Sequence, residues 1–277
     1  METFRDRIAI VTGAGSGIGA ALSRGLAGFG ARVVCADLAA DNAATVAGVI
    51  QHAGGTANAT PLDVTQASQV QALVQQTVET YGRLDFMFNN AGVSVTGDAR
   101  DLDLAHWRQV LDVNLMGVVY GADAAYKQMV RQGHGHIVNI ASLAGLIPFP
   151  TNVPYATSKH AVVGLSLSLR AEGQDLGVKV SVVCPGFIQS NIFNATPFIN
   201  LDRSRAMRNI PFTPIPSERA AILILRGVAR NDPVIIFPGY ARFLWMLHRL
   251  GGRLLRPLHL KGIRDMRKFR GSSGAAP

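Results

Sequence analysis

RIAIVTGAGSGIG, residues 7–19, is the segment that decides the fold of this chain. Its first six residues form an apolar, β-branched run typical of a buried strand, and glycines follow at positions 13, 15, 17 and 19 before a helical segment. Such a glycine-rich turn lets backbone amides approach a pyrophosphate, whose charge the helix N-terminus then stabilises. The turn alone is a weak signal, but Asp37 stands about twenty residues further on, where a second predicted strand ends. Together they predict a dinucleotide site.

Apolar runs and amphipathic segments alternate along the rest of the chain, without a repeat or a linker before residue 240. Because the runs are apolar on both faces, they indicate a parallel sheet covered by helices on both sides. We therefore predict an α/β fold with a doubly wound, seven-stranded parallel sheet, in one domain over residues 1–239. The helix at 104–132 is expected to break near Asn114. The predicted strands are 7–12, 32–36, 57–62, 84–89, 136–140, 178–184 and 234–237, and the other helices are 40–52, 65–81, 155–173 and 217–231.

The two cysteines and the N-terminus bear on the cellular compartment. Cys35 and Cys184 both lie inside apolar runs, so we expect buried, reduced thiols and no disulfide. The acidic Glu2 and Asp6 lead directly into the first strand, which is unlike a signal peptide. These features predict a cytoplasmic protein.

Positive charge is concentrated at the C-terminus. The net charge is +9, and residues 240–277 hold nine Lys and Arg but one acid, Asp265, so the rest of the chain is nearly neutral. A nucleic-acid interface would need basic groups interleaved with stacking aromatics or a known reading module, and neither is evident. We therefore predict no nucleic-acid partner. His134 and His136 lack the spacing of metal ligands, so no metal site is predicted.

Residues 240–258 predict a basic amphipathic helix, weakened by Gly251-Gly252 and ended near Pro257. No apolar run is long enough to span a bilayer. The helix fits two interpretations equally: it lies on an anionic membrane, making the protein peripherally membrane-associated, or it docks on its own domain or a dimer partner. Residues 271–277 are predicted to be disordered. The apolar face would hold Tyr240, Phe243, Leu244, Leu247, Leu250, Leu254 and Leu258, opposite Arg242, Arg249, Arg253 and Arg256.

The segment SLAGLIPFPTNVPYATSK, Ser142 to Lys159, carries the predicted chemistry. On a helix, Tyr155 and Lys159 lie one turn apart on the same face. A phenol titrates at about pH 10, and a lysine cation beside it favours the phenolate and lowers the phenol's pKa. A nearby serine hydroxyl can hold the oxygen whose proton is moved. These groups suit proton transfer at an alcohol or a carbonyl.

Taken together, these motifs resemble the short-chain dehydrogenase/reductase family, in its single-domain branch with a Rossmann-type fold, over residues 4–188. The resemblance implies that Tyr155 is the general acid/base and that Ser142 orients the substrate oxygen. It implies that Lys159 lowers the tyrosine pKa and binds the nicotinamide ribose, and that Asn114 holds a water in a proton relay. The matching motifs are Thr12–Gly19, Asn89-Asn90-Ala91-Gly92, the set Asn114, Ser142, Tyr155 and Lys159, and Pro185-Gly186.

Asp37 favours one nicotinamide cofactor. Its carboxylate can accept hydrogen bonds from the adenosine ribose and would repel a 2′-phosphate, and residues 38–40 include no Arg or Lys. We therefore predict NAD in preference to NADP. Asp63 either holds the adenine edge or caps the next helix with Thr65. The family pattern places the cofactor on Gly13, Ser16, Gly17, Ile18, Gly19, Asp37, Asp63, Val64, Asn90, Ala91, Gly92, Tyr155, Lys159, Pro185, Gly186, Ile188 and Ser190.

A lid over the substrate is expected at residues 187–216. Its apolar composition, with the loop before Tyr155, predicts a small lipophilic alcohol or ketone as the substrate: a steroid, a retinoid-like molecule, or an aromatic or long-chain alcohol. Alternatively, the lid side chains pack on each other or on a sister subunit. The lid residues are Phe187, Ile188, Ile192, Phe193, Phe198, Ile199, Ile210, Phe212 and Ile215.

The leading hypothesis is an NAD-dependent alcohol dehydrogenase. An NADPH-dependent ketoreductase and a non-catalytic cofactor-binding scaffold are the alternatives. The intact set of Asn114, Ser142, Tyr155 and Lys159 argues against the scaffold. The C-terminal segment IIFPGYARFLWMLHRL replaces the Gly-rich end that many members of the family use between subunits. We therefore expect a homodimer in preference to a tetramer.

Overall fold

The computed structural model describes residues 1–208, 212–268 and 270. Ile210 and the segment 271–277, predicted to be disordered, lie outside these residues, as does the side chain of Phe193.

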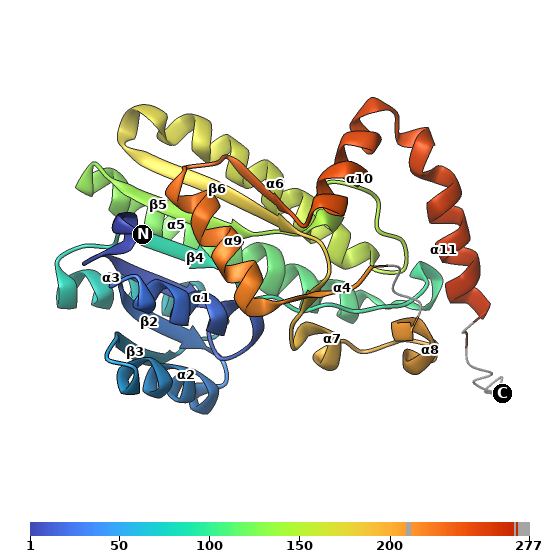
Figure 1. Cartoon of the computed structure of the whole chain (residues 1–277). Helices are drawn as coiled ribbons and strands as arrows, with labels where there is room; N and C mark the ends of the chain where they lie inside the picture. The colour runs from blue at the N-terminus through green and yellow to red at the C-terminus, as the bar shows by residue number, and fades with distance from the viewer. Residues whose placement is uncertain (209–211, 269, 271–277) are drawn as a thin grey trace.

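A seven-stranded parallel sheet forms the centre of the molecule, in the order β3-β2-β1-β4-β5-β6-β9 (Figure 1). All residues of β1 are buried, because β1 lies inside the sheet with helices on both faces. The seven predicted strands and their parallel arrangement are confirmed. Their bounds are β1 Ile8–Thr12, β2 Arg32–Asp37, β3 Thr56–Pro61, β4 Phe86–Asn89, β5 Gly135–Ile140, β6 Val178–Pro185 and β9 Val234–Phe237.

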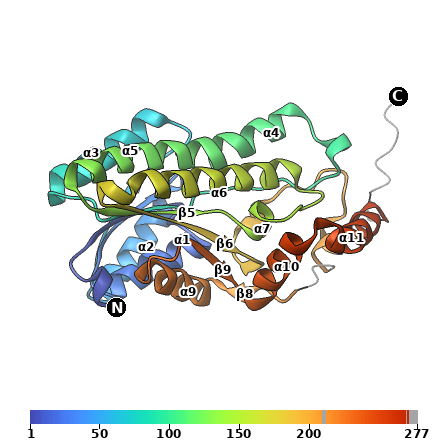
Figure 2. The ribbon, with the colours of Figure 1, turned by 90° about the horizontal axis from the view of Figure 1, so that it is seen from above.

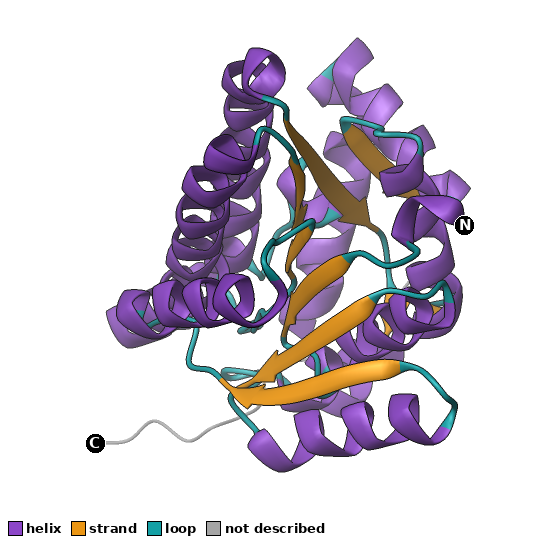
Figure 3. Cartoon of the chain, turned by 90° about the vertical axis from the view of Figure 1, so that its left-hand side faces the viewer, coloured by secondary structure: helices purple, strands orange, loops and turns teal. Residues whose placement is uncertain are grey.

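Helices cover both faces of the sheet (Figures 2 and 3). On one face α1 packs against α2 and α9, and on the other α5 packs against α3 and α6. Two buried apolar clusters lie between these layers and the sheet, around Leu26 and Ile224 on one side and Leu73 and Met129 on the other. The helices are α1 Gly17–Gly28, α2 Ala40–His52, α9 Ser217–Ala229, α3 Ala67–Tyr81, α5 Gly117–Gln132 and α6 Val153–Gly173.

The chain reverses its direction of winding at β1, which has β2 on one side and β4 on the other. In open parallel sheets ligands bind beyond the carboxyl ends of the strands at such a switch point. The glycine turn follows β1, Asn90 follows β4, and Ser142 follows β5 by two residues. The topology therefore brings the predicted motifs to one edge of the sheet.

The predicted helix at 104–132 breaks where expected. It consists of α4 (Leu104–Leu111), a π-helical turn (Asp112–Met116) and α5. Asn114 lies in the π-helical turn and is fully buried. Single π turns inside α-helices often occur at functional sites, because the extra residue redirects a side chain.

The connections around the sheet edge are short elements. The lid holds a two-stranded pair, β7 with β8, and two short helices. These are β7 Ile188–Gln189, α7 Ile192–Ala195, α8 Arg203–Arg208 and β8 Ile215–Pro216. Turns of 3₁₀ helix lie at Glu2–Phe4, Ala99–Asp101, Leu143–Gly145 and Gln174–Leu176.

The C-terminal segment differs from the single helix predicted to end near Pro257. It forms α10 (Gly239–Leu250), a 3₁₀ turn (Gly252–Leu255) and a second helix, α11 (Arg256–Lys268). Pro257 lies in the first turn of α11, where a missing N–H costs nothing, so this proline begins a helix and does not end one. No helix in the described part of the chain is long and apolar enough to cross a bilayer.

Candidate active site

The glycine turn is locked to the segment after β4 by close backbone contacts. Asn90 Nδ2 donates to the carbonyl oxygens of Thr12 at 2.9 Å and Gly13 at 3.2 Å. Thr12 Oγ1 accepts from the amide of Ala91 at 3.1 Å. A Cβ on Gly19 would lie 2.6 Å from Asn90 Nδ2, which leaves no room for a side chain there. The glycines thus allow an approach of two segments that any larger residue would prevent.

Asp37 is fixed at the end of β2 beside the same turn. Its carboxylate accepts from the amide of Gly15 at 2.8 Å and from the amide of Ala39 at 2.9 Å. A carboxylate has about four acceptor positions, so two remain for the hydroxyl groups of a ribose. The two amides hold a negative charge at the position where the sequence predicts the adenosine ribose.

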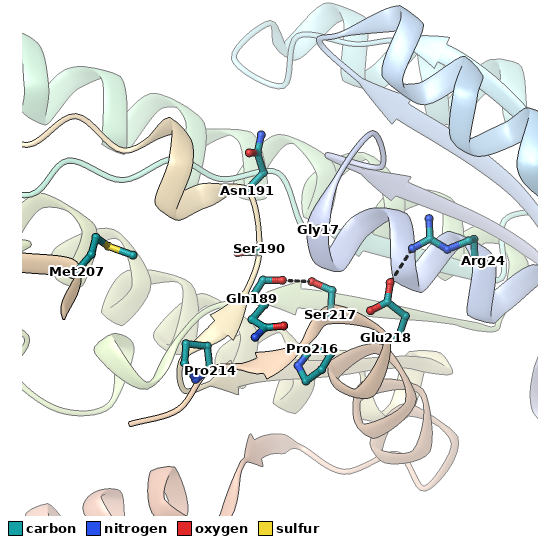
Figure 4. Close-up of a pocket in the computed structure, with 10 residues that line it drawn as sticks. All are labelled: Gly17, Arg24, Gln189, Ser190, Asn191, Met207, Pro214, Pro216, Ser217 and Glu218. Atoms are coloured by element: carbon teal, nitrogen blue, oxygen red, sulfur yellow. Dashed lines mark hydrogen bonds and ion pairs between the residues drawn. The ribbon is translucent and has the colours of Figure 1, made fainter. Parts of the chain in front are cut away.

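A cleft of about 560 Å³ separates the glycine turn from the lid (Figure 4). Gly17, at the N-terminus of α1, lines it on one side, and Ser190 and Asn191 line it on the other. A helix N-terminus favours an anion, and the exposed Ser16 just before it adds a hydroxyl group. This cradle of glycines at a helix N-terminus fits the pyrophosphate of a dinucleotide.

Two polar contacts border this cleft, and Figure 4 draws both as dashed lines. Ser217 Oγ donates to the carbonyl of Gln189 at 2.6 Å, and Arg24 pairs with Glu218 at 3.0 Å between α1 and α9. Ile18 lies beside Gly17 and is partly buried, while Ile188 is buried in β7.

Tyr155, Lys159 and Ser142 come together at the carboxyl end of β5. A hydrogen bond joins the side chains of Ser142 and Tyr155. Ser142 Oγ also accepts from the amide of Ala144 at 3.1 Å, which fixes the position of the hydroxyl group. Lys159 Nζ lies 5.5 Å from the centroid of the Tyr155 ring and donates to the carbonyl of Ile140 at 2.8 Å.

Burial shifts the pKa values of Tyr155 and Lys159 in opposite directions. Burial raises the pKa of Tyr155, and the hydrogen bond from Ser142 opposes this rise. Lys159 is 3% exposed, and burial lowers its pKa from 10.5 to about 8. In the protein without its cofactor, desolvation of the phenolate is thus the largest influence on the pKa of Tyr155. The lowering of this pKa by Lys159 stays a prediction.

Asn114 is bonded to the loop after β4. Its Oδ1 accepts from the amide of Val93 and its Nδ2 donates to the Val93 carbonyl, both at 2.8 Å. Its Nδ2 also lies 3.3 Å from Ser158 Oγ, on the helix of Tyr155. A Cβ on Gly92 would be 3.3 Å from Asn114 Oδ1 and 3.6 Å from Lys159 Nζ, so all three residues meet at one point. The structure thus unites the four predicted catalytic residues.

Asp63 and Val64 lie at the far end of the predicted cofactor site. Asp63 Oδ1 accepts from the amide of Thr65 at 2.9 Å and from its hydroxyl at 2.8 Å, and these bonds lower the pKa of Asp63. The helix itself begins at Ala67 after Gln66, so Asp63 forms a local turn and does not cap it. Val64 is buried against Gly117. An adenine contact for Asp63 stays a prediction.

The turn after β6, Pro185-Gly186, depends on a residue that the sequence did not assign to the site. Tyr240 Oη, from α10, accepts from the amide of Phe187 at 2.6 Å. Its ring stacks on Phe212 with centroids 4.0 Å apart. A side chain on Gly186 would collide with the Tyr240 ring. The pattern around Tyr240 shows only helical periodicity, so nothing local to it indicates this distant contact.

The apolar side chains of the lid pack partly on each other. Phe187 contacts Phe149 and Phe212, with ring centroids 6.2 and 6.3 Å apart. Phe212 in turn stacks on Tyr240. Packing of the lid side chains on each other, one of the expected alternatives, is therefore present. The same rings form an apolar wall beside the Pro185-Gly186 turn.

Comparison with known proteins agrees with this geometry. A family model described as short chain dehydrogenase matches residues 7–197. An uncharacterised oxidoreductase from Staphylococcus aureus strain MRSA252 is 36% identical over 192 residues, 69% of this chain and 82% of that protein. The ketoacyl reductase HetN from Nostoc is 36% identical over 188 residues, 68% of this chain and 66% of that protein.

Solved structures also match. A short-chain dehydrogenase/reductase from Burkholderia phymatum in complex with NAD superposes with a TM-score of 0.83 at 27% identity, covering 100% of both chains. Levodione reductase superposes with a TM-score of 0.76 at 26% identity, covering 85% of this chain and 97% of its own.

The chain belongs to the short-chain dehydrogenase/reductase family. It is an NAD(P)-dependent oxidoreductase with the Rossmann-type fold of that family. The individual roles of the cofactor-binding residues stay predictions from the sequence. The contacts described above are consistent with these predicted roles.

Proposed function

We propose that this protein is an NAD-dependent oxidoreductase that interconverts a lipophilic secondary alcohol and its ketone. The observation that carries the choice of NAD is the Asp37 carboxylate, held by the amides of Gly15 and Ala39 beside the glycine turn. A 2′-phosphate would meet this fixed negative charge, and Leu38, Ala39 and Ala40 offer no cation to offset it.

The residues of the site divide the proton chemistry between them. When bound, the nicotinamide supplies hydride transfer at the substrate carbon. Tyr155 removes the hydroxyl proton during oxidation and returns it during reduction, while Ser142 donates a hydrogen bond to the same substrate oxygen. Lys159 is held by the Ile140 carbonyl and keeps a positive charge near the tyrosine, which becomes more important as the phenolate forms.

Two further observations support the proposal. The wall formed by Phe149, Phe187 and Phe212 is apolar, which suits a lipophilic substrate. A protein of the same fold, the Burkholderia phymatum dehydrogenase/reductase, was solved in complex with NAD.

The test is a comparison of cofactors in a screen of hydrophobic secondary alcohols. Wild-type protein should turn over with NAD and show little activity with NADP. The double variant Asp37→Asn/Leu38→Arg should shift the ratio of kcat/KM toward NADP by about a hundredfold, because one like charge is lost and an arginine can bind the 2′-phosphate. Asp41→Ser, an exposed acid nearby on α2, is the matched control and should leave the ratio unchanged.

A second candidate is an NADPH-dependent ketoreductase. It is favoured by the similarity to a ketoacyl reductase from Nostoc. The same comparison decides between them: a wild-type protein that reduces β-ketoacyl thioesters with NADPH far faster than with NADH would favour the second candidate and contradict the role given to Asp37.

A further inference from the structure

The C-terminal arm, residues 240–264, exposes an unusual amount of apolar surface. In the described part of the chain, thirteen large hydrophobic side chains are exposed, and six of them lie between residues 243 and 260. Phe243 is 64% exposed and Leu250 is 82% exposed. Such a concentration marks an interaction site, whereas isolated exposed hydrophobics are ordinary. The six are Phe243, Met246, Leu250, Leu254, Leu258 and Leu260.

The arm does not need these side chains for its own attachment. Its inner face is already anchored by Ala241, Leu244 and Leu255, which are buried in a cluster with β6 and β9 residues. Tyr240 and Leu247 pack against the same cluster. The predicted single apolar stripe is therefore divided: one part docks on the domain, and the other part faces outward. The interpretation that the helix docks on its own domain therefore holds for one face, and the membrane interpretation stays a prediction for the other.

Positive charge surrounds the exposed apolar side chains. Residues 240–264 contain six Lys and Arg and no Asp or Glu. All six basic residues are exposed. On α10, Arg242 and Arg249 precede Phe243 and Leu250 in the chain, so positive charges border the exposed apolar side chains. The six are Arg242, Arg249, Arg253, Arg256, Lys261 and Arg264.

We propose that the outer face of this arm binds the surface of an anionic lipid bilayer, with α10 and α11 lying in the interfacial plane. An apolar strip bordered by Lys and Arg, without acids, matches the hydrocarbon boundary and the anionic headgroups together. A second copy of the chain fits poorly. A two-fold interface would place this basic surface, whose one acid is Asp265 on α11, against itself, and the like charges would repel.

The arm lies at the end of the molecule opposite the N-terminus (Figure 2). At the far end of α11, Arg267 Nε donates to Asp98 at 2.7 Å. The adjoining loop is tied to the start of the Tyr155 helix, since the amide of Gly97 donates to the Thr151 carbonyl at 2.8 Å. A bilayer that binds the arm would therefore lie beside the segments that border the active site. Membrane binding itself does not depend on the proposed cofactor or substrate.

Flotation with lipid vesicles tests the proposal on the full-length protein. Wild-type protein should bind vesicles of phosphatidylcholine with phosphatidylserine and bind pure phosphatidylcholine vesicles much less, and salt should weaken the binding. Arg253→Glu/Arg256→Glu should reduce partitioning about tenfold or more, because each basic group contributes near an anionic surface. Phe243→Ser/Leu250→Ser should reduce it to a similar extent through the loss of apolar burial.

Matched controls carry the same changes at exposed positions elsewhere. Arg131→Glu/Arg219→Glu and Leu176→Ser/Ile222→Ser should bind the anionic vesicles as the wild-type protein does. Sedimentation velocity and NADH binding without vesicles should be the same for all variants, which separates this result from any failure of the proposed activity. Equal vesicle binding by arm and control variants would overturn the proposal. A change of oligomeric state in the arm variants would also overturn it, by identifying a subunit interface.

Discussion

Two turns border the active site, and they are held in different ways. The glycine turn after β1 is fixed by backbone contacts, in which missing side chains allow Gly13 and Gly19 to approach Ala91 and Asn90. The Pro185-Gly186 turn after β6 is fixed by a hydroxyl from α10, more than fifty residues away in the chain. The glycine turn is fixed by residues of the family motifs themselves. The Pro185-Gly186 turn depends on a C-terminal segment outside residues 7–197, which match the family model.

The largest effect is expected from a substitution that removes the proton-transfer group and leaves both turns intact. Tyr155→Phe should lower kcat about a thousandfold or more, because the general acid/base is lost. NADH binding, followed by fluorescence, should stay close to the wild-type level. Tyr126→Phe is the matched control, since its hydroxyl has no hydrogen-bond partner among the described residues, and it should be fully active. Near-normal turnover by Tyr155→Phe would refute the assignment.

The next effect breaks the glycine turn. In Gly19→Ala the new Cβ would meet Asn90 Nδ2 at 2.6 Å and the Gly13 carbonyl carbon at 2.8 Å. We expect a loss of about 2–3 kcal/mol of unfolding free energy from overpacking, together with weaker NADH binding. Gly28→Ala, on the same helix, meets no atom within 4 Å and should be neutral or slightly stabilising. Denaturant titration measures both, and equal stability of the two variants would contradict the close packing.

A smaller effect is expected from a substitution that weakens the Pro185-Gly186 turn. Tyr240→Phe keeps the stacked ring but removes the acceptor for the Phe187 amide, which should cost about 1–2 kcal/mol and raise the KM for NADH more than it lowers kcat. Tyr81→Phe loses an exposed hydrogen bond from Asn58 and should change neither quantity. If Tyr240→Phe leaves the KM for NADH unchanged, α10 does not position this turn.

The smallest effect concerns the sheet that carries both turns. Burial lowers the pKa of His136 from 6.5 to about 3, and its Nε2 lies 2.9 Å from Ser181 Oγ. The unfolded chain therefore binds more protons than the folded one below about pH 6.5, so stability falls as pH falls, by about 1 kcal/mol between about pH 7 and pH 5.5.

This pH dependence should affect the stability of the whole domain and not of one turn alone. Thermal unfolding of His136→Gln should show a weaker decline with acid than the wild-type protein, while the exposed His52→Gln should follow the wild-type curve. An identical decline in His136→Gln would show that other groups control the acid sensitivity.

Much of the site was predictable from the sequence because it is encoded by local patterns. The seven strands alternate with helices, and four short motifs place their residues at the carboxyl edge of a parallel sheet. The break near Asn114 was also expected, although its π-helical form was not. The division of the C-terminal arm and the start of α11 at Arg256 were not predicted, because an apolar periodicity does not say which part of a stripe finds a partner.

The sequence by itself determined the family and the parallel sheet, and it predicted the proton-transfer residues, because short motifs in the chain carry this information. Only the tertiary structure decided the directions in which the pKa values of Tyr155 and Lys159 shift, because burial is the largest cause of both shifts. The tertiary structure also assigned Tyr240 to the second turn and left Phe243 and Leu250 exposed. Contacts between distant segments determine which apolar side chains are covered, and no local pattern encodes those contacts.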